Sequence, residues 1–423
     1  MLIVQKYGGS SVATPERMRS VAQRVVASRR AGNRLVVVVS AMGDTTDDLL
    51  TLAGEVIGGE GGPAARHPRE TDMLLTSGER ISMALLAMAI REAGEEAISL
   101  TGSQAAIITD EAHTSARITE VRGERIHQAL EGEQVVIVAG FQGVSASREV
   151  TTLGRGGSDT SAVALAVGLG AERCEVYSDV RGVYTADPRR VPSARLVPEL
   201  SHEEMLELAA AGAQVMHSRA VEIAARYGLD LYLGSALEAG ADTIGTRVTR
   251  TPRRMEELVL TGIAAKGGQA KIILRQLPAG LRTVTAVLVA LAEGGVSVDM
   301  IWEGEDADGG IQLHLTVTED GLAEAERILG ALIGRMGGGR LKVQRGLSRI
   351  ALVGSGMHQR PGVYAKTFRA LLEQEIDIFA VSTSGISITV LVEAAREQDA
   401  VRALHDAFTL EMVGGRAAAA SGR

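Results

Sequence analysis

The strongest constraint on the fold is an unbroken run of apolar, mostly β-branched residues, RLVVVVS at 34–40, bounded by turn residues. A half-exposed strand alternates apolar and polar side chains, whereas an unbroken apolar strand must be covered on both faces. Comparable runs lie at 2–6, 134–143 and 175–180, each with a helix-like segment before or after it. Strands that alternate with helices up to about residue 240 predict a mostly parallel sheet between layers of helices.

Local signals delimit the first helix and one break in the pattern. Thr14 is expected to cap the helix, Pro15 to occupy its first position and Gly32 to end it. The segment GGEGGPAARHPRE at 58–70 is so rich in Gly and Pro that we expect a flexible insertion without helix or strand.

The composition narrows the classes of function. The chain has 423 residues, enough for about two to four domains. Aromatic residues make up only 3%, which disfavours an aromatic stacking platform, and the net charge of -8 disfavours nucleic-acid binding. The single cysteine, Cys174, cannot form an intrachain disulfide, the N-terminus lacks the features of a signal peptide, and no apolar run approaches a membrane span. We therefore expect a cytoplasmic protein that binds small molecules and no membrane.

The second half of the chain contains an internal repeat. The sequences that begin at Lys271 and Arg349 lie 78 residues apart, as do those around Asp299 and Asp377. Each copy predicts a β-α-β-β unit, and two such units suggest paired ferredoxin-like modules. The expected organisation is a catalytic domain (1–245), a linker (246–257), two repeats (258–345 and 346–412) and a disordered tail (413–423).

Several common uses of an α/β sheet are not supported by the sequence. It contains no Walker phosphate loop, no dinucleotide-binding fingerprint, no HExxH and no GxSxG. One cysteine and eight scattered histidines provide no zinc site. What remains is a set of polar clusters at the ends of predicted strands, where open α/β sheets bind ligands.

Three of these clusters are weak on their own. In KYGGSS, Lys6 ends the first strand, and glycines 8 and 9 allow backbone N–H groups to approach an anion. VSAMGDTTDD adds Ser40 and Thr46 after the second strand, and TSGER adds Glu79. Each also has an ordinary interpretation, as a tight turn with a surface lysine or as helix caps.

The segment TTLGRGGSDTSA at 151–162 is more specific. Arg155 and two glycines stand with Ser158 and Asp159 immediately before the apolar helix AVALAVGLGA. Helix N-termini hold phosphate or carboxylate groups, and arginine binds a carboxylate through two hydrogen bonds. Asp159 could instead be only the N-cap, but a cap requires neither the arginine nor the glycines. We therefore predict an anion site here.

A last cluster, YSDVRGVYTADPRR at 177–190, contains several polar residues around turn signals. By itself it predicts a loop with Asx-type turns. Together with the other clusters it suggests a nucleotide pocket.

These motifs occur in an order and at a spacing that are known from one family. From Leu2 to about Leu410 the chain resembles an aspartate kinase of the amino-acid kinase family followed by two ACT regulatory domains. The segments that carry the resemblance are KYGGSS, VVVVSAM, TSGER, TGSQAAIITD, VAGFQG, TTLGRGGSDTSAVALA, YSDVRGVYTADPRRV and HSRAVEIA.

The resemblance implies a fold and a reaction. The fold is an open three-layer αβα kinase domain with a mostly parallel sheet, followed by two ferredoxin-like ACT domains. The reaction transfers the γ-phosphoryl group of ATP to the side-chain carboxylate of L-aspartate and gives 4-phospho-L-aspartate, the first step toward lysine, threonine and methionine. The implied cofactors are ATP and Mg²⁺, the metal being held mainly by the ATP phosphates.

The family's site residues map onto three groups in this chain. The implied catalytic residues are Lys6 and Asp159. The implied aspartate-binding residues are Ser40, Thr46, Glu79, Arg155 and Ser158. The implied phosphate- and nucleotide-binding residues are Gly8, Gly9, Ser10, Gly156, Gly157, Ser178, Asp179, Tyr184, Asp187, Arg189 and Gln214.

The chain departs from the family in the kinase half at several places, which include Ser218 where the family has a proline. Ser178 stands where the family usually has threonine and keeps the hydroxyl. Gln214 replaces a lysine, which puts ATP affinity in question, and Asp47 replaces an asparagine and adds a negative charge near an anionic substrate.

The regulatory half departs more. The second repeat keeps Pro361–Gly362 at a helix entrance, whereas the first has Thr283–Val284 at the equivalent offset, and STSG at 382–385 replaces the family's STSE. We therefore expect weakened or altered inhibition by lysine and threonine. The implied effector residues are Asp299, Gly362, Ser382 and Thr383.

The implied partners are other chains. ACT sheets commonly pair edge to edge, so we expect a homo-oligomer or a hetero-oligomer with a short chain that starts near Met255. Two alternatives stay open: another amino-acid or carbamate kinase of this fold, and a catalytically silent amino-acid sensor.

Overall fold

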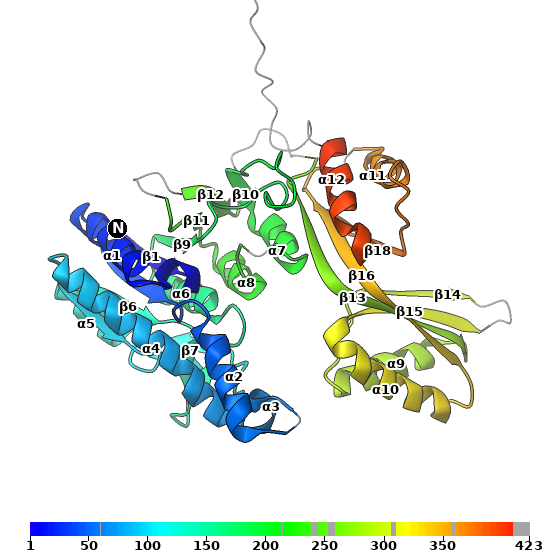
Figure 1. Cartoon of the computed structure of the whole chain (residues 1–423), viewed down its shortest axis with the longest axis horizontal. Helices are drawn as coiled ribbons and strands as arrows, with labels where there is room; N and C mark the ends of the chain where they lie inside the picture. The colour runs from blue at the N-terminus through cyan, green and yellow to red at the C-terminus, as the bar shows by residue number, and fades with distance from the viewer. Residues whose placement is uncertain are drawn as a thin grey trace, which may run out of the picture. The chain divides into compact units, whose positions relative to one another are not determined.

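The computed structural model describes residues 1–59, 61–213, 215–238, 244–252, 259–305, 310–357 and 360–408 (Figure 1). The chain divides into two compact units. The first comprises Met1–Tyr184, Leu196–Ala210 and Gln214–Met255, and the second comprises Thr185–Arg195, Ala211–Ala213 and Glu256–Arg423. Gln214, Met255 and the predicted tail at 413–423 lie outside the described residues.

The first unit is built on a large, mostly parallel sheet, as predicted. Its strand order is β10-β12-β11-β9-β1-β2-β6-β3, and within it only β11 and β12 pair antiparallel among the described strands. The strands are β1 (Leu2–Tyr7), β2 (Arg34–Val39), β3 (Ala97–Leu100), β6 (Val135–Ala139), β9 (Arg173–Ser178), β10 (Glu199–Ser201), β11 (Leu231–Ser235) and β12 (Ile244–Thr249).

Helices cover both faces of this sheet. The helices of the unit are α1 (Pro15–Arg30), α2 (Thr45–Ile57), α3 (Pro63–Arg66), α4 (Pro68–Glu92), α5 (Glu124–Glu131), α6 (Gly157–Gly168), α7 (His202–Ala210) and α8 (Ser218–Tyr227). Leu35, Val37 and Val39 of β2 pack in one core with α1 and α4, while α5 and α6 contact β2 as well. Every residue from Leu35 to Val39 is fully buried, so the unbroken apolar run does report a strand covered on both faces.

A second, smaller sheet completes the unit and was not predicted. Its order is β5-β4-β7-β8, with β4 (Ile107–Thr109), β5 (Ile118–Val121), β7 (Gln142–Ser145) and β8 (Val150–Thr152). The predicted strand at 134–143 is split between the two sheets, because Phe141 adopts a positive φ of 67° between β6 and β7. This break carries the chain from the large sheet to the small one.

Of the two local predictions, the structure confirms the limits of the first helix and contradicts the flexible insertion at 58–70. Thr14 caps α1 by accepting the N–H of Arg17, as predicted, and Gly32 follows the helix with φ 88°. The prediction of a segment without helix or strand at 58–70 was wrong. Pro63 and Pro68 each begin a helix, where the missing N–H of proline costs no hydrogen bond.

Helix α4 is the one helix among the described residues that is long and apolar enough to cross a membrane, which the sequence analysis did not anticipate. Half of its most apolar window is buried inside the protein. Packing against α1 and the large sheet accounts for this buried half, whereas Ile81, Leu85 and Met88 are exposed.

The second unit contains both predicted repeats in one continuous sheet of order β14-β15-β13-β16-β18-β17 (Figure 1). Its strands are β13 (Gly262–Leu277), β14 (Ile301–Glu305), β15 (Ile311–Thr318), β16 (Arg340–Val353), β17 (Ala380–Thr383) and β18 (Ser387–Glu393). Its helices are α9 (Leu281–Glu293), α10 (Glu319–Arg335), α11 (Val363–Leu372) and α12 (Glu397–Phe408). Each repeat has the predicted β-α-β-β order followed by a further helix, and each has its own apolar core.

Two details of the division differ from the predicted domain limits. The limit at 345/346 falls inside the continuous strand β16. The segment Thr185–Arg195 belongs to the second unit, because Ala186 and Val191 are buried in the core formed with α11 and α12. The domain limits proper stay a prediction.

Burial of α6 allows a stability prediction. Leu165 is fully buried, so Leu165→Ala should lower the free energy of unfolding by about 2–5 kcal/mol, through lost apolar contacts and a new cavity. Leu52→Ala, at a side chain that is 52% exposed, is the matched control and should cost less than about 1 kcal/mol. Urea unfolding followed by circular dichroism would measure both, and equal midpoints for the two variants would contradict the packing described.

Candidate active site

Four parallel strands of the large sheet end at the same edge. β9, β1, β2 and β6 are successive neighbours, so the loops that follow them leave the sheet side by side. The pairing continues past the strand ends: Gly8 N–H donates to Tyr177 O at 3.2 Å, and Gly140 N–H donates to Val39 O at 3.0 Å. The polar residues predicted at strand ends therefore gather at one edge, the usual ligand side of an open α/β sheet.

Lys6 and Asp159 form an ion pair at this edge. Lys6 Nζ lies 2.6 Å from Asp159 Oδ1, and each side chain is only 12% exposed. The other carboxylate oxygen of Asp159 accepts the N–H of His217 at 3.2 Å. A lysine on β1 and an aspartate more than 150 residues later are thus held in contact in a largely water-excluded place.

The helix that carries Asp159 begins earlier than predicted. α6 starts at Gly157, so Ser158 and Asp159 lie in its first turn and not before it, and the alternative that Asp159 is the N-cap is wrong. Gly156 is the cap residue, with φ 71°, and a Cβ atom there would lie 2.2 Å from the His217 ring. Only glycine fits this approach, which leaves Asp159 free to face Lys6.

Backbone approaches that require glycine also shape the loop after β1. A Cβ atom on Gly9 would lie 2.8 Å from Ala41 O, whereas one on Gly8 would make only an ordinary contact, 3.4 Å from Lys6 Nζ. Ser10 is exposed, and its carbonyl oxygen accepts a hydrogen bond from Arg17. The loops after β1 and β2 are therefore packed backbone to backbone beside the lysine ammonium.

Glu79 is a buried carboxylate with an open oxygen. It is 3% exposed, and Oε1 accepts the N–H of Ala41 at 3.1 Å, while Oε2 is buried with no hydrogen-bond partner among the described residues. Burial raises the pKa of Glu79 to about 7. α4 can approach this loop because a Cβ on Gly78 would already lie 2.8 Å from the Ala41 Cβ. Such an oxygen can accept hydrogen bonds from a cation that enters the site.

The other predicted substrate residues lie around this core. Ser158 is buried against Gly140, where an added Cβ would come within 2.9 Å of the Ser158 Cβ. Ser40 and Thr46 are half-buried, at the end of β2 and in the first turn of α2. Arg155 is exposed, in the loop between β8 and α6.

The predicted nucleotide residues are divided between the two units. Ser178 ends β9 in the first unit and forms a local turn with Val180, and Asp179 next to it is exposed. Tyr184 is half-buried and bridges to Leu196. Asp187 and Arg189 belong to the second unit, so their place in one pocket with Lys6 stays a prediction.

Asp187 makes a local turn of the expected Asx type. Its Oδ1 accepts both the backbone N–H and the Nε–H of Arg189, each at 3.0 Å. Hydrogen bonds from Arg189 lower the pKa of Asp187.

The predicted effector residues lie in the second unit. Asp299, before β14, forms an ion pair with Arg349 of β16, whereas Ser382 and Thr383 are exposed on the edge strand β17. Gly362 precedes α11 with φ 95°. The assignment of Thr283–Val284 to the equivalent place in the first repeat was wrong, because the chain after β13 is shorter and Gly280, with φ 117°, precedes α9.

A metal ion was expected only with ATP. Within the described ranges, no group of three or more His, Cys, Asp or Glu side chains could hold a metal ion. Asp159 is the carboxylate next to the lysine ammonium.

The sequence analysis did not identify Asp72 and Arg219, which form hydrogen bonds with residues just before the Arg155 loop. Asp72 lies on α4 and is fully buried; it binds His113, Thr114 and Thr152. Arg219 of α8 donates hydrogen bonds to the carbonyl oxygens of Leu153 and Ala116. One signal could have found Asp72: it precedes Glu79 by seven residues and so shares a helix face with it.

Comparison with known proteins finds family models and relatives that match this chain. A model of the amino acid kinase family matches residues 1–235, and an ACT domain model matches residues 350–408. The aspartokinase of Mycolicibacterium smegmatis is 47% identical over 414 residues, which is 97% of this chain and 96% of that protein. The aspartokinase of Geobacillus stearothermophilus is 43% identical over 411 residues, 97% of each chain.

Solved structures give the same result. E. coli aspartokinase III in complex with aspartate and ADP superposes with a TM-score of 0.81 at 25% identity, over 97% of this chain and 100% of that one. The same enzyme with lysine and aspartate gives a TM-score of 0.73 at 26% identity, over 96% and 99% of the two chains. With the sheet edge, the glycine-lined loops and the Lys6–Asp159 pair described above, these relationships show that the chain belongs to the aspartokinases of the amino acid kinase family.

Proposed function

We propose that this protein transfers the γ-phosphoryl group of ATP to the side-chain carboxylate of L-aspartate and releases 4-phospho-L-aspartate. The observation that carries the proposal is the Lys6–Asp159 pair beside the glycine loop, with the open oxygen of Glu79 on the neighbouring helix. A cationic group for phosphate and an anionic group for an ammonium ion suit ATP and an amino acid.

The chemistry requires positioning and neutralisation of charge. The acceptor carboxylate is already ionised near neutral pH, so no strong base is needed, and the transition state carries its charge on the phosphoryl oxygens. Lys6 would neutralise this charge, while backbone groups at Gly8, Gly9 and Ser10 and at the start of α6 would hold phosphate oxygens. Asp159 holds the lysine ammonium in place.

Two residues would fix the aspartate substrate at its ends. Glu79 offers its open oxygen to the amino group, and Arg155 would bind a carboxylate through two hydrogen bonds. Ser40, Thr46 and Ser158 would supply hydroxyl donors between them.

The nucleotide would be held by the chain after β9. We assign this role to Ser178, Asp179 and Tyr184, and to Asp187, Arg189 and Gln214 by resemblance to the family. A relative of known structure binds ADP with aspartate. Mg²⁺ would be held mainly by the ATP phosphates with Asp159 beside it, and when bound it supplies further positive charge.

Regulation would reside in the second unit. An E. coli relative has been solved with lysine, which supports an amino acid as effector. We assign Asp299, Gly362, Ser382 and Thr383 to effector binding, with lysine or threonine as the ligand. Assembly into a homo-oligomer, or with a short chain that starts near Met255, a cytoplasmic location and a role in lysine, threonine and methionine synthesis are parts of the same proposal.

Replacement of Lys6 tests the catalytic assignment. Lys6→Ala should reduce formation of aspartyl hydroxamate from aspartate, ATP and hydroxylamine by about a thousandfold, because the phosphoryl charge loses its neutralising group. Lys266→Ala, at an exposed lysine of β13, is the control and should keep full activity. Substantial product from Lys6→Ala would refute the role given to Lys6, and no product from the unaltered chain would refute the function itself.

The pKa of Glu79 predicts a pH dependence. The ionised form binds the substrate ammonium, and burial raises the pKa to about 7, so kcat/KM for aspartate should rise about tenfold per pH unit below that pKa and level off above it. Initial rates at low aspartate between pH 5.5 and about 8.5 would measure this. Glu79→Gln should raise KM for aspartate and remove the inflection. The same inflection in Glu79→Gln would assign it to another group.

Gly385, the last residue of STSG, predicts weak inhibition of the enzyme by lysine and threonine. Gly385 offers no carboxylate to an effector ammonium, so Gly385→Glu should lower the lysine or threonine concentration for half-inhibition by about tenfold. Nothing lies within 4 Å of a Cβ at Gly385 or at Gly334, which makes Gly334→Glu on α10 a matched control with no expected effect. Activity would be titrated with lysine, threonine and both. Strong inhibition of the unaltered chain by either amino acid would contradict the hypothesis.

A further inference from the structure

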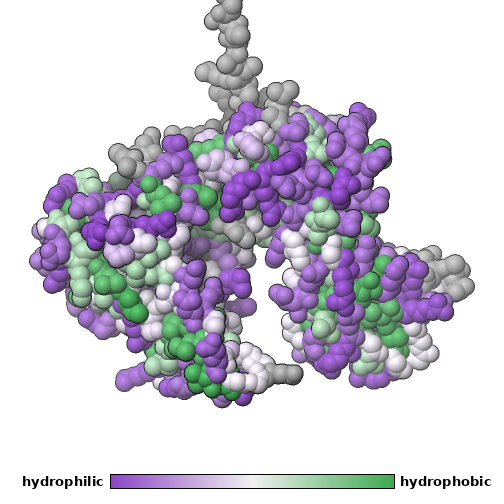
Figure 2. Space-filling view, in the orientation of Figure 1, coloured by the Kyte–Doolittle hydropathy of each residue, from purple (hydrophilic) through white to green (hydrophobic). Residues whose placement is uncertain are grey.

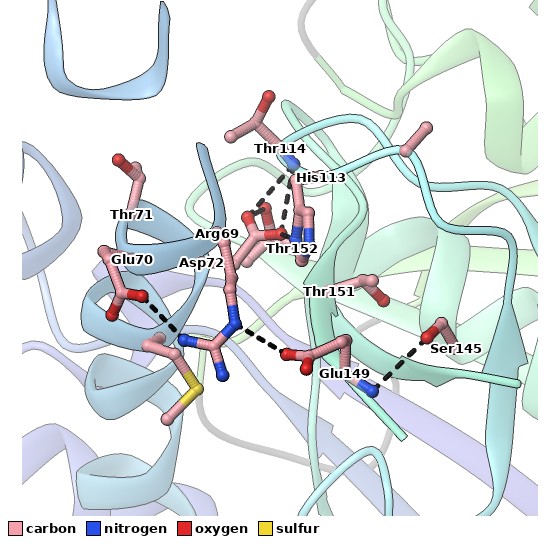
Figure 3. Close-up of polar contacts among 12 residues, drawn as sticks. Arg69, Glu70, Thr71, Asp72, His113, Thr114, Ser145, Glu149, Thr151 and Thr152 are labelled. Carbon is pink, nitrogen blue, oxygen red and sulfur yellow. Dashed lines mark hydrogen bonds and ion pairs between the residues drawn. The ribbon is translucent and has the colours of Figure 1, made fainter. Parts of the chain in front are cut away.

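A fully buried carboxylate that the proposed chemistry does not use lies on the same helix as Glu79. Asp72 of α4 is 0% exposed and has three hydrogen-bond partners (Figure 3). Thr152 Oγ1 lies 2.6 Å away, His113 Nδ1 2.7 Å and Thr114 N 3.1 Å. The Thr152 hydroxyl and the Thr114 N–H donate to this carboxylate, and the His113 ring nitrogen is its third hydrogen-bond partner.

Two of these residues, Thr152 and Thr114, lie next to the loop that carries Arg155. Thr152 is the last residue of β8, three positions before Arg155. Thr114 adopts a positive φ of 66°, which is costly for a β-branched residue and persists only where its surroundings hold it. A Cβ on Gly154 would lie 3.0 Å from Thr114 O, so the held residue Thr114 is packed against the loop itself.

The same short segment is fixed from its other side. Ala116 N–H donates to Thr152 O at 2.9 Å, Leu153 N–H donates to Phe141 O at 2.8 Å, and Arg219 donates to Leu153 O at 2.8 Å. Thr152 and Leu153 therefore have fixed backbone positions, and the Asp72 carboxylate fixes the Thr152 side chain. Arg155 follows after one glycine.

The face of α4 that carries Asp72 also carries Glu79. Asp72, Thr76 and Glu79 are spaced by four and three residues and are all buried, so they form one polar row about 10 Å long. Thr76 O accepts Gln142 Nε2 of β7 at 3.2 Å. Helix α4 thus carries Glu79 at one end of this row and Asp72, which bonds to Thr152 just before the Arg155 loop, at the other.

We propose that Asp72 and Thr152 are positioning residues that fix the separation of Glu79 and Arg155 and thereby set the length of amino acid that the site accepts. The inference rests on the proposed function, in which Glu79 binds the amino group and Arg155 a carboxylate. A substrate with one more methylene requires a wider separation, which a loop fixed at Thr152 resists. Loss of the Thr152 hydroxyl loosens the loop and leaves Glu79, Lys6 and Asp159 in place.

Two adjacent threonines of β8 provide a matched test. Thr151 and Thr152 are equally buried, but Thr151 bonds to Thr109 of β4 at 2.7 Å, within the small sheet, whereas Thr152 bonds to Asp72 of α4 (Figure 3). Thr151→Val and Thr152→Val each remove one buried hydroxyl and keep the side-chain volume. The full chain would be assayed for KM of aspartate, KM of ATP, the ratio of kcat/KM for aspartate over glutamate, and thermal stability.

The proposal predicts a split between these readouts. Thr152→Val should raise KM for aspartate about tenfold and lower the preference for aspartate over glutamate by a similar factor, with KM for ATP within about twofold. Thr152→Ser should behave like the unaltered chain, and so should Thr151→Val. If Thr152→Val does not fold, His113→Ala removes a hydrogen-bond partner of the same carboxylate at a partly exposed position and should raise KM for aspartate about threefold.

Other results would overturn the proposal. Equal values of KM for aspartate in Thr151→Val and Thr152→Val, or parallel increases in KM for aspartate and ATP, would show that the Asp72 contacts serve stability alone. An unaltered chain that phosphorylates glutamate but not aspartate would instead refute the proposed function. The two failures are therefore distinguishable.

Discussion

The contact between Lys6 and Asp159 is the interaction on which the site depends. It joins the central strand β1 to the first turn of α6, and both side chains are largely withdrawn from water. Removal of a charge from water is costly unless the charge is paired, so neither residue would be tolerated there alone. The pair satisfies both charges while no phosphate is present, and it keeps an ammonium group at the edge where four strands end.

The surroundings of this pair are built from close backbone contacts. Gly9 and Gly156 lie where any side chain would collide with Ala41 O or with the His217 ring. The first approach brings the loops after β1 and β2 together, and the second packs the start of α6 against His217. A site for phosphate oxygens needs this arrangement more than it needs additional charge. The net charge of -8 is consistent with a local, not a global, anion site.

Helix α4 connects the substrate half of the site to the small sheet. Figure 3 shows its Asp72 carboxylate at the centre of hydrogen-bond partners from 113–114 and from β8. Arg69 of the same helix forms an ion pair with Glu149 (Figure 3), an exposed pair of little energetic weight. Figure 2 shows apolar side chains exposed over parts of the first unit. Ile81, Leu85 and Met88 of α4 are exposed apolar residues of this unit. The buried polar residues of α4 are Thr71, Asp72, Thr76, Glu79 and Ser82.

The sequence alone determined the large parallel sheet, the first helix and the repeated β-α-β-β units, because apolar periodicity and caps are local properties. It also predicted Lys6 and Asp159 as parts of polar clusters at strand ends, whereas Glu79, predicted in the same way, lies within α4. Only the tertiary structure decided that Asp159 faces Lys6, that Glu79 keeps an open oxygen, and that Asp72 bonds to Thr152. These contacts join residues 38 to 153 positions apart, and their geometry depends on how helices pack on the sheet, which no local pattern specifies.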